Sequence, residues 1–263
     1  MRVKHSVHAS TSVEVFKQMF ELTLCLACER QKFISVFFKQ IEKEIKKDSG
    51  ILVKQNFGGK SYLAIAVNDD KKDYVKSLVL DFIVKIIVED FKYNFFKEHI
   101  ISNSCGLFTD AFFMAVSIFD SEIDKEIISS LIEFDSEIVI ESFYYFKLQG
   151  LKEKWQRTAN VINQNGIMNN DKSVLEVLKY LCAVSENNAV LVNLLFSKDK
   201  IELKNYYSEK KFKCDFVGLS NLYLEIIRLN PMKITIKGDD GEQNYENVSE
   251  TLKSVFEDKI YFN

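Results

Sequence analysis

Apolar residues recur every three to four positions over most of this sequence, a period that predicts helices. The pattern is clearest from Asp73 to His99, where apolar rows face a row of polar residues. The same spacing predicts a long helical stretch, as one helix or two, from Val13 to Lys47. Further helices are expected at Leu107–Phe119, Glu122–Phe134, Glu137–Arg157 and Asp171–Glu186. We expect these helices to pack as a bundle.

Shorter runs with strand character flank this helical region. Ile51–Val53 and Tyr62–Val67 lie on either side of Gly58-Gly59, a pair that tolerates the positive φ angles of a tight turn, so a β-hairpin is expected there. A short polar strand is expected at Arg2–His8. After residue 188 strands and helices alternate, and the expected elements are Ala189–Phe196, Ile201–Tyr207, Asp215–Leu229 (helix), Met232–Lys237, Val248–Phe256 (helix) and Lys259–Phe262.

This order of elements predicts an α+β fold. We expect a mostly helical bundle with an N-terminal β-hairpin and a C-terminal α/β unit that forms a small sheet. The corresponding segments are 1–68 for the N-terminal helix and hairpin, 69–186 for the bundle and 187–263 for the α/β unit. Together they can form one compact domain.

Composition narrows the class of protein further. The chain has 263 residues, of which 47% are hydrophobic and 28% charged, and this excludes intrinsic disorder. A single proline and 9 glycines argue against a turn-rich all-β protein, and a net charge of −3 is too small to steer the chain toward a polyanion. Neither a secretory signal nor a membrane span is expected. The 5 cysteines, an odd number, fit a reducing compartment, so we expect a cytoplasmic protein.

Cys25 and Cys28 form the strongest local motif, a Cys-x-x-Cys pair. Thiolates at this spacing can share a metal ion or form a redox pair, and His5 and His8 upstream can complete a tetrahedral zinc site. Apolar residues surround the two thiols, however, and free cysteine is among the residues most often buried in cores. We therefore expect core packing, with a zinc-binding or redox protein as an alternative function.

Charged residues on the predicted helices are interpreted as solvated. Asp120 and Asp124 belong to an alternating acidic run that lacks the glycine and the bidentate glutamate of a calcium loop, so a solvated helix start is expected. We likewise place Lys92 on the polar face of the helix Asp73–His99.

A basic stretch with interleaved tyrosines covers residues 198–213. Such a stretch can grip single-stranded nucleic acid by stacking and charge, but acidic residues dilute it here. We expect a strand edge protected by lysines and keep a nucleic-acid-binding module as an alternative function. The candidate contact residues are Tyr206, Tyr207, Lys210 and Lys211.

An aromatic cluster at Phe143–Phe146, together with Trp155, is expected to lie in the core or on a surface that faces a partner. Phe143, Tyr144 and Trp155 are its candidate interaction residues. Since no group of titratable residues converges in the sequence, we predict no catalytic residue, no cofactor and no bound metal.

Several strings between residues 60 and 263 occur in an order that carries a resemblance. They are Tyr74–Ile83, Glu98–Ile101, Ile138–Gln149, Trp155, Leu175–Leu181, Ala189–Phe196, Leu229–Ile236 and Val255-Phe256. In pattern and order they resemble the YtxC-like family of sporulation proteins from spore-forming Firmicutes. Ser142 and Lys147 depart from the glycine and arginine that are usual there, so no role of a bidentate arginine is carried over.

The resemblance implies a cytoplasmic protein of a sporulating bacterium and supplies no catalytic residue. We therefore expect a non-enzymatic sporulation protein that acts through contacts with a protein partner. The nucleic-acid-binding module and the zinc-binding or redox protein remain as the alternatives.

Overall fold

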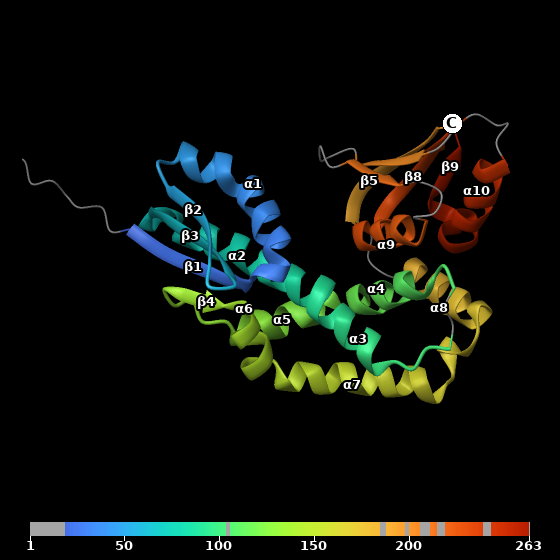
Figure 1. Ribbon diagram of the computed structural model, residues 1–263, viewed down its shortest axis with the longest axis horizontal. Coiled ribbons are helices and arrows are strands. Elements are labelled where there is room, and N and C mark those ends of the chain that lie inside the picture. The colour runs from blue at the N-terminus through green and yellow to red at the C-terminus, as the bar shows by residue number, and fades with distance from the viewer. Residues whose placement is uncertain are drawn as a thin grey trace, which may run out of the picture. The chain divides into compact units, whose positions relative to one another are not determined.

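The computed structural model describes residues 19–103, 106–184, 188–197, 200–205, 211–214, 219–238 and 243–262. Over these residues the chain is α+β, which confirms the predicted fold class (Figure 1). The chain divides into two compact units: unit 1 comprises Met1–Asp81 and Glu133–Phe143, and unit 2 comprises Phe82–Ile132 and Tyr144–Asn263. The division at residues 68 and 186 follows the sequence pattern and stays a prediction.

Unit 1 is built on a four-stranded sheet with the order β2-β3-β1-β4. β1 runs antiparallel to β3 and parallel to β4, while β2 and β3 form an antiparallel hairpin. Helix α1 connects β1 to β2, and β3 lies between these two strands, which is a split β-α-β arrangement. The elements are β1 (Met19–Ala27), α1 (Gln31–Lys47), β2 (Ile51–Phe57), β3 (Lys60–Asn68) and β4 (Glu137–Val139).

β1 corrects the helix predicted over Val13–Lys47, since residues 19–27 form a strand; in the described part of that range, helical structure is confined to α1 and the short 3₁₀ turn before it. Apolar residues spaced by four fit a helix, but Leu22, Leu24 and Leu26 also alternate as in a strand, and all three are buried. Hydrogen-bonded partners on both sides, β3 and β4, stabilise the extended form. Tertiary pairing therefore decides between two local patterns that the sequence permits.

The hairpin predicted around Gly58-Gly59 is confirmed. These two glycines form the turn between β2 and β3, with φ angles of 57° and 77°. The left-handed region is costly for residues with a Cβ atom, and a turn of this kind matches the twist of the strands it joins. The carbonyl of Gly59 also accepts a hydrogen bond from the Cys28 N–H at 3.0 Å, which ties the turn to the end of β1.

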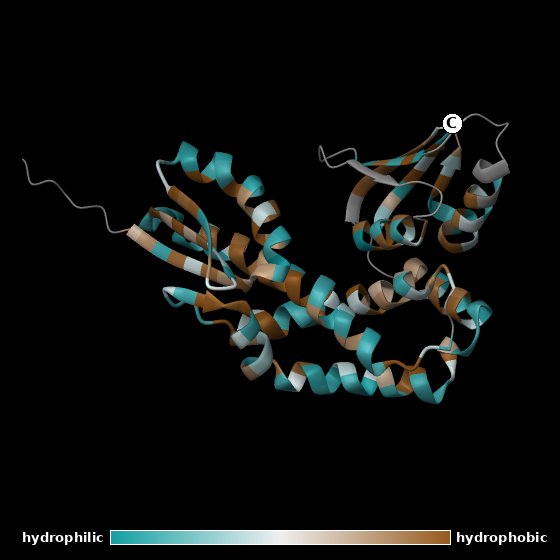
Figure 2. Cartoon of the chain, viewed as in Figure 1, coloured by the Kyte–Doolittle hydropathy of each residue, from teal (hydrophilic) through white to brown (hydrophobic). Residues whose placement is uncertain are grey.

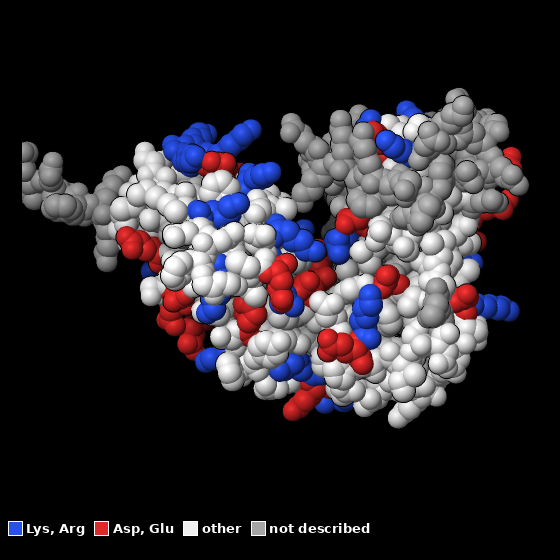
Figure 3. Space-filling view, viewed as in Figure 1, with Lys and Arg blue, Asp and Glu red and all other residues white. Residues whose placement is uncertain are grey.

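α1 covers one face of this sheet with an apolar stripe formed by Ile34, Phe37, Ile41 and Ile45. The opposite side of α1 is charged, and Lys and Arg side chains gather over this helix in Figure 3. One of its lysines, Lys46, pairs with Glu42 at 2.6 Å. Next to α1 lies the start of α2 (Lys72–Ile86), where the Tyr74 hydroxyl donates to the Glu44 carboxylate. Both helices thus lie on the same side of the sheet.

The helix predicted at Asp73–His99 is confirmed as a continuous element with a change of pitch. α2 passes into a π-helical segment at Ile87–Lys92, which continues as α3 (Tyr93–His99). In unit 2, α4 (Thr109–Phe119) is buried over most of its length and contacts α3 and α8. The remaining helices of this part are α5 (Ser121–Leu131), α7 (Gln149–Gln164) and α8 (Asp171–Val184). Figure 2 shows α7 as hydrophilic over much of its visible side.

The helix predicted at Glu137–Arg157 is corrected at its N-terminal half. Residues 137–139 form β4, and a short helix α6 (Ile140–Ser142) leads into a second π-helical segment at Phe143–Lys147. α7 begins only after Leu148. The strand forms because β1 offers a parallel partner, with Thr23 opposite Glu137 in register. That partner is distant in sequence, so local periodicity does not reveal it.

The C-terminal part of unit 2 contains a five-stranded sheet with the order β7-β6-β5-β8-β9. β8 runs parallel to both of its neighbours, β5 and β9, whereas β5-β6-β7 is an antiparallel meander. This sheet confirms the predicted α/β unit. Its elements are β5 (Asn188–Ser197), β6 (Lys200–Asn205), β7 (Lys211–Cys214), α9 (Leu219–Leu229), β8 (Pro231–Lys237), α10 (Gln243–Phe256) and β9 (Ile260–Phe262).

Candidate functional site

The predicted aromatic cluster divides into a buried part and an exposed part. Phe143, Tyr144 and Trp155 are buried, with Trp155 at 0% exposure, whereas Tyr145 and Phe146 are 54% and 78% exposed. Successive residues of the π-helical segment Phe143–Lys147 point in different directions around its axis, so the first two aromatic side chains face the core and the next two face solvent. Only Tyr145 and Phe146 are therefore open to a partner, and we call these two residues the aromatic patch.

Buried aromatic rings pack around Tyr144, the residue that precedes the aromatic patch. The Tyr144 ring stacks on Phe91 with centroids 4.3 Å apart and on Trp155 at 6.3 Å. The Tyr145 carbonyl accepts a hydrogen bond from Gln149 Nε2 at 2.5 Å. Both π-helical segments contribute to this packing, because Phe91 belongs to the first one and Tyr144 to the second.

The basic stretch 198–213 is described only in part. Its described residues belong to β6 and β7, which pair antiparallel, and Lys211 begins β7 opposite Lys204 in register. Tyr206, Tyr207 and Lys210 lie outside the described residues. The strand β7 is not among the elements that the sequence predicts, and the nucleic-acid hypothesis for residues 198–213 stays a prediction.

Cys25 and Cys28 lie at the end of β1 and in the 3₁₀ turn that follows it. Cys25 is fully buried, and this burial raises the pKa of its thiol above the ordinary value. A raised pKa disfavours the thiolate that metal binding and disulfide exchange both require. His5 and His8, the other residues of the zinc hypothesis, lie outside the described residues. Among the residues that the structure describes, no group of three or more His, Cys, Asp or Glu is placed to hold a metal ion.

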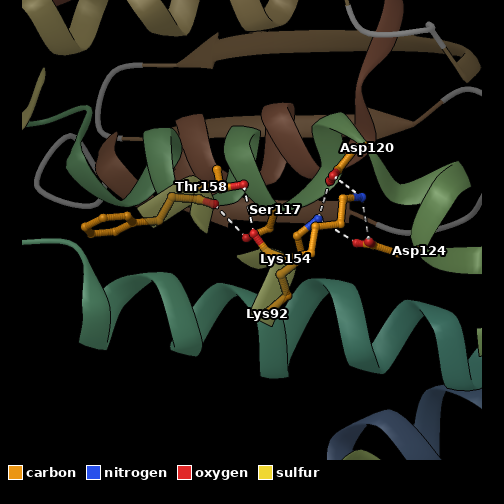
Figure 4. A network of polar contacts seen from close by, with 7 residues as sticks. Lys92, Ser117, Asp120, Asp124, Lys154 and Thr158 are labelled. Carbon is orange, nitrogen blue, oxygen red and sulfur yellow. Dashed lines mark hydrogen bonds and ion pairs between the residues drawn. The ribbon is translucent and has the colours of Figure 1, made fainter. Parts of the chain in front are cut away.

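A network of buried charges forms where the first π-helical segment meets α5 and α7 (Figure 4). The Lys92 side chain is 1% exposed, and its Nζ donates to Asp124 Oδ2 at 2.5 Å and to the Asp120 carboxylate. Lys154 Nζ lies 2.7 Å from Asp120 Oδ2 and 3.6 Å from Asp124 Oδ1. Two ammonium groups thus face two carboxylates, and their formal charges cancel.

This network corrects two predictions of solvated charge. Asp124 is 0% exposed, although the acidic run of α5 is predicted to face water. Lys92 is buried because the π-helical segment Ile87–Lys92 holds an extra residue per turn, which rotates the later residues away from the face that regular helical spacing assigns to them. Asp120 is the residue just before α5 and Asp124 follows four positions later in its first turn; this spacing is the signal in the sequence that could have indicated a shared cation.

The two carboxyl groups respond in opposite directions to this environment. Burial, with the neighbouring charge of Asp120, raises the pKa of Asp124 above its ordinary value, and Lys92 only partly offsets this. Burial also acts on Asp120, but Lys92 and Lys154 together outweigh it and lower the pKa of that carboxyl. Opposed shifts of this kind accompany acid–base sites and structural ion networks alike. The full pairing of Lys92 within the chain favours a structural role here.

A cavity of about 710 Å³ lies between the end of α3 and the start of α4. Its charged residues are Lys97 and Asp110, and Asp110 Oδ1 accepts hydrogen bonds from Lys97 Nζ at 3.0 Å and from the Tyr93 hydroxyl at 2.8 Å. The hydrogen bond to Asp110 raises the pKa of Lys97. None of the described residues that line this cavity is a histidine or a cysteine. Its charges are thus already paired with each other.

No protein-family model matches this sequence, and neither a curated protein nor a solved structure matches the chain. Over the described residues, none of the helices has both the length and the apolar character that crossing a membrane requires. The interpretation of the site therefore depends on its own residues.

Proposed function

We propose that this chain is a non-enzymatic, sporulation-associated protein that acts by contacting another protein. The observation that carries the proposal is the aromatic patch, where Tyr145 and Phe146 are 54% and 78% exposed above buried rings. The patch lies within Ile138–Gln149, one of the strings that resemble the YtxC-like family. This resemblance supports the sporulation context.

The physical case for a contact surface depends on rigidity and apolar area. Aromatic side chains are frequent binding hot spots, because each removes a large apolar area from water at a low cost in conformational entropy. Tyr145 is restrained further by Lys152, whose Nζ lies 5.7 Å from the centre of its ring and 3.3 Å from its carbonyl oxygen. Groups that are already ordered before binding lose less entropy when a partner arrives.

The test is complementation in a spore-forming host from which the gene has been deleted. We expect deletion to lower spore yield and the wild-type chain to restore it. A chain with Tyr145→Ser and Phe146→Ser should fail to restore the yield while remaining folded. The matched control is Tyr180→Ser on α8, where the tyrosine is 63% exposed but belongs to another surface.

Two results would count against the proposal. Normal spore yield after deletion would contradict the sporulation context. Full restoration by the Tyr145→Ser/Phe146→Ser chain would contradict the role of the aromatic patch. Circular dichroism of each purified variant separates a lost contact from a lost fold.

A further inference from the structure

The sheet of unit 1 has a second face, opposite α1; α6 contacts β1 and Cys25 is buried there, but the part formed by the edge strand β2 is exposed. Side chains alternate between the faces of a strand, so the residues next to those under α1 point to the other side. On edge strand β2 these are Ile51, Val53 and Phe57, which are 56%, 50% and 72% exposed. We call this surface the open face.

The open face is apolar and shallow. Small residues on the inner strands, among them Ala64 and Ala66, leave a depression of about 90 Å³ bordered by Ile51. Exposed apolar side chains on an edge strand are an aggregation hazard unless something covers them. The small residues at its centre and the large apolar side chains on β2 allow another β-sheet of similar shape to pack on this face.

Charged side chains lie at opposite ends of the open face. Glu21 pairs in register with Ala66 near one end, and Lys60 pairs with Ala27 at the other. At about 3.3 Å per residue, the two ends are roughly 20 Å apart along the strands. Glu137 lies in the acidic half, opposite Thr23. At the basic end, the Glu141 carboxylate accepts the Ala27 N–H at 2.8 Å and is half-buried, whereas Lys60 is exposed.

We propose that a second copy of this chain covers the open face, related by a two-fold axis that runs across the strands. Such an axis reverses strand direction, so the Lys60 end of one copy lies over the Glu21 end of the other, and the pairing occurs twice. A two-fold axis along the strands would instead bring the two Lys60 ends together, which like charges disfavour. The charge pattern therefore selects one of the two ways in which two identical faces can stack.

The size of the face sets the expected strength of this association. Three strands about 4.8 Å apart and about seven residues long, with the 3 residues of β4 beside them, give a flat footprint of roughly 400 Å². A stable interface buries about 800 Å² per partner. The dimer should therefore be weak and reversible. This inference does not depend on the sporulation proposal or on the aromatic patch.

The decisive experiment is sedimentation equilibrium of the full chain over a micromolar concentration range, with charge reversals at the two ends. We expect the wild-type chain to dimerise, and Lys60→Glu or Glu21→Lys alone to weaken the dimer at least tenfold. The double variant Lys60→Glu/Glu21→Lys should restore most of the affinity, because the pairs reform with their signs exchanged. Both residues are exposed, so these variants are expected to fold.

A second set of variants tests the apolar surface. Val53→Glu together with Phe57→Ser should give a monomer, and Tyr180→Ser should dimerise like the wild type. A wild-type chain that stays monomeric over the whole range would overturn the proposal. It would also be overturned by a dimer that withstands the Val53→Glu/Phe57→Ser change, or by charge reversals that fail to compensate.

Discussion

Lys92 Nζ lies 2.5 Å from Asp124 Oδ2, and the two side chains are 1% and 0% exposed. Burying an ion pair gives little net stability by itself, because both charges lose their hydration. Removing one partner is much more costly, since the other charge is left buried without compensation. The folded state should therefore depend on the intact ion pair, which joins the first π-helical segment to α5.

Lys92→Met should destabilise the protein by about 3–5 kcal/mol at neutral pH, because Asp124 and Asp120 then share only Lys154 as a cation. The Asp124 pKa is already raised by burial, and without Lys92 it should rise further. A carboxyl whose pKa is raised in the folded state contributes stability at low pH that is lost as the pH rises through that pKa. The deficit of Lys92→Met should therefore shrink as the pH falls from neutral toward about 5, measured by urea unfolding.

Two further variants control this experiment. Lys92→Met/Asp124→Leu removes the pair as a unit and should recover most of the loss, since apolar replacement of a buried ion pair is often neutral. Lys172→Met removes a lysine whose side chain is 86% exposed and should change stability by no more than about 0.5 kcal/mol. Wild-type stability for Lys92→Met itself would contradict the assigned role.

Gly59→Ala should destabilise the chain by about 1–2 kcal/mol, because Gly59 has a φ of 77° and residues with a Cβ atom disfavour that region. Gly150→Ala is the matched change in α7, where an added Cβ meets no atom within 4 Å. It should stabilise the chain by up to about 1 kcal/mol, since alanine favours the helix. Thermal unfolding followed by far-ultraviolet circular dichroism measures both, and equal effects of one sign would contradict the expectation.

Alkylation should distinguish the cysteines. Burial raises the pKa of Cys182 to about 12, against the opposing influence of Lys259, and burial also raises the pKa of Cys25. With iodoacetamide at mildly alkaline pH, Cys28, which is partly exposed, should be modified before either of them. Peptide mass spectrometry provides the measurement, and unfolding in urea should remove the protection. Rapid modification of Cys182 in the folded chain would count against its burial.

Tyr144→Leu should cost about 1–3 kcal/mol, because the Tyr144 ring loses its stacking on Phe91 and Trp155. Tyr145→Leu, one residue later and 54% exposed, should stay within about 0.5 kcal/mol of the wild type. The chain has 1 tryptophan, so the fluorescence of Trp155 follows unfolding around this cluster directly. Similar losses for both variants would argue that the side chains are not divided as described.

Much of the fold was accessible from the sequence because the relevant signals are local. The helix from Asp73 to His99 has a regular apolar face, and the Gly58-Gly59 pair by itself predicts the hairpin turn. β1 and β4 were assigned to helices because their strand character depends on each other and on β3, and a short window contains no such information. Propensity is a weak guide where pairing between distant segments decides the structure.

The candidate site was harder to predict for a related reason. The π-helical segment Ile87–Lys92 changes the phase of the helix by one residue, so regular spacing places Lys92 on the wrong face. The aromatic cluster is predicted to lie in the core or on a surface that faces a partner, and the structure divides it between buried Tyr144 and exposed Phe146. The error at Lys92 comes from assuming a constant 3.6-residue period.

The strand β4 has a consequence for how this protein is made. Its residues leave the ribosome long after those of β1, and 114 residues separate Ala27 from Glu141, which are joined by a hydrogen bond in the finished chain. While the intervening helices are being synthesised, the nascent N-terminal part carries an unfilled edge at β1. A fragment that stops anywhere between Phe82 and Ile132 would lack β4, and the edge of β1 would stay unpaired. Because unit 1 contains segments from both sides of this range, a single cut cannot separate the two units.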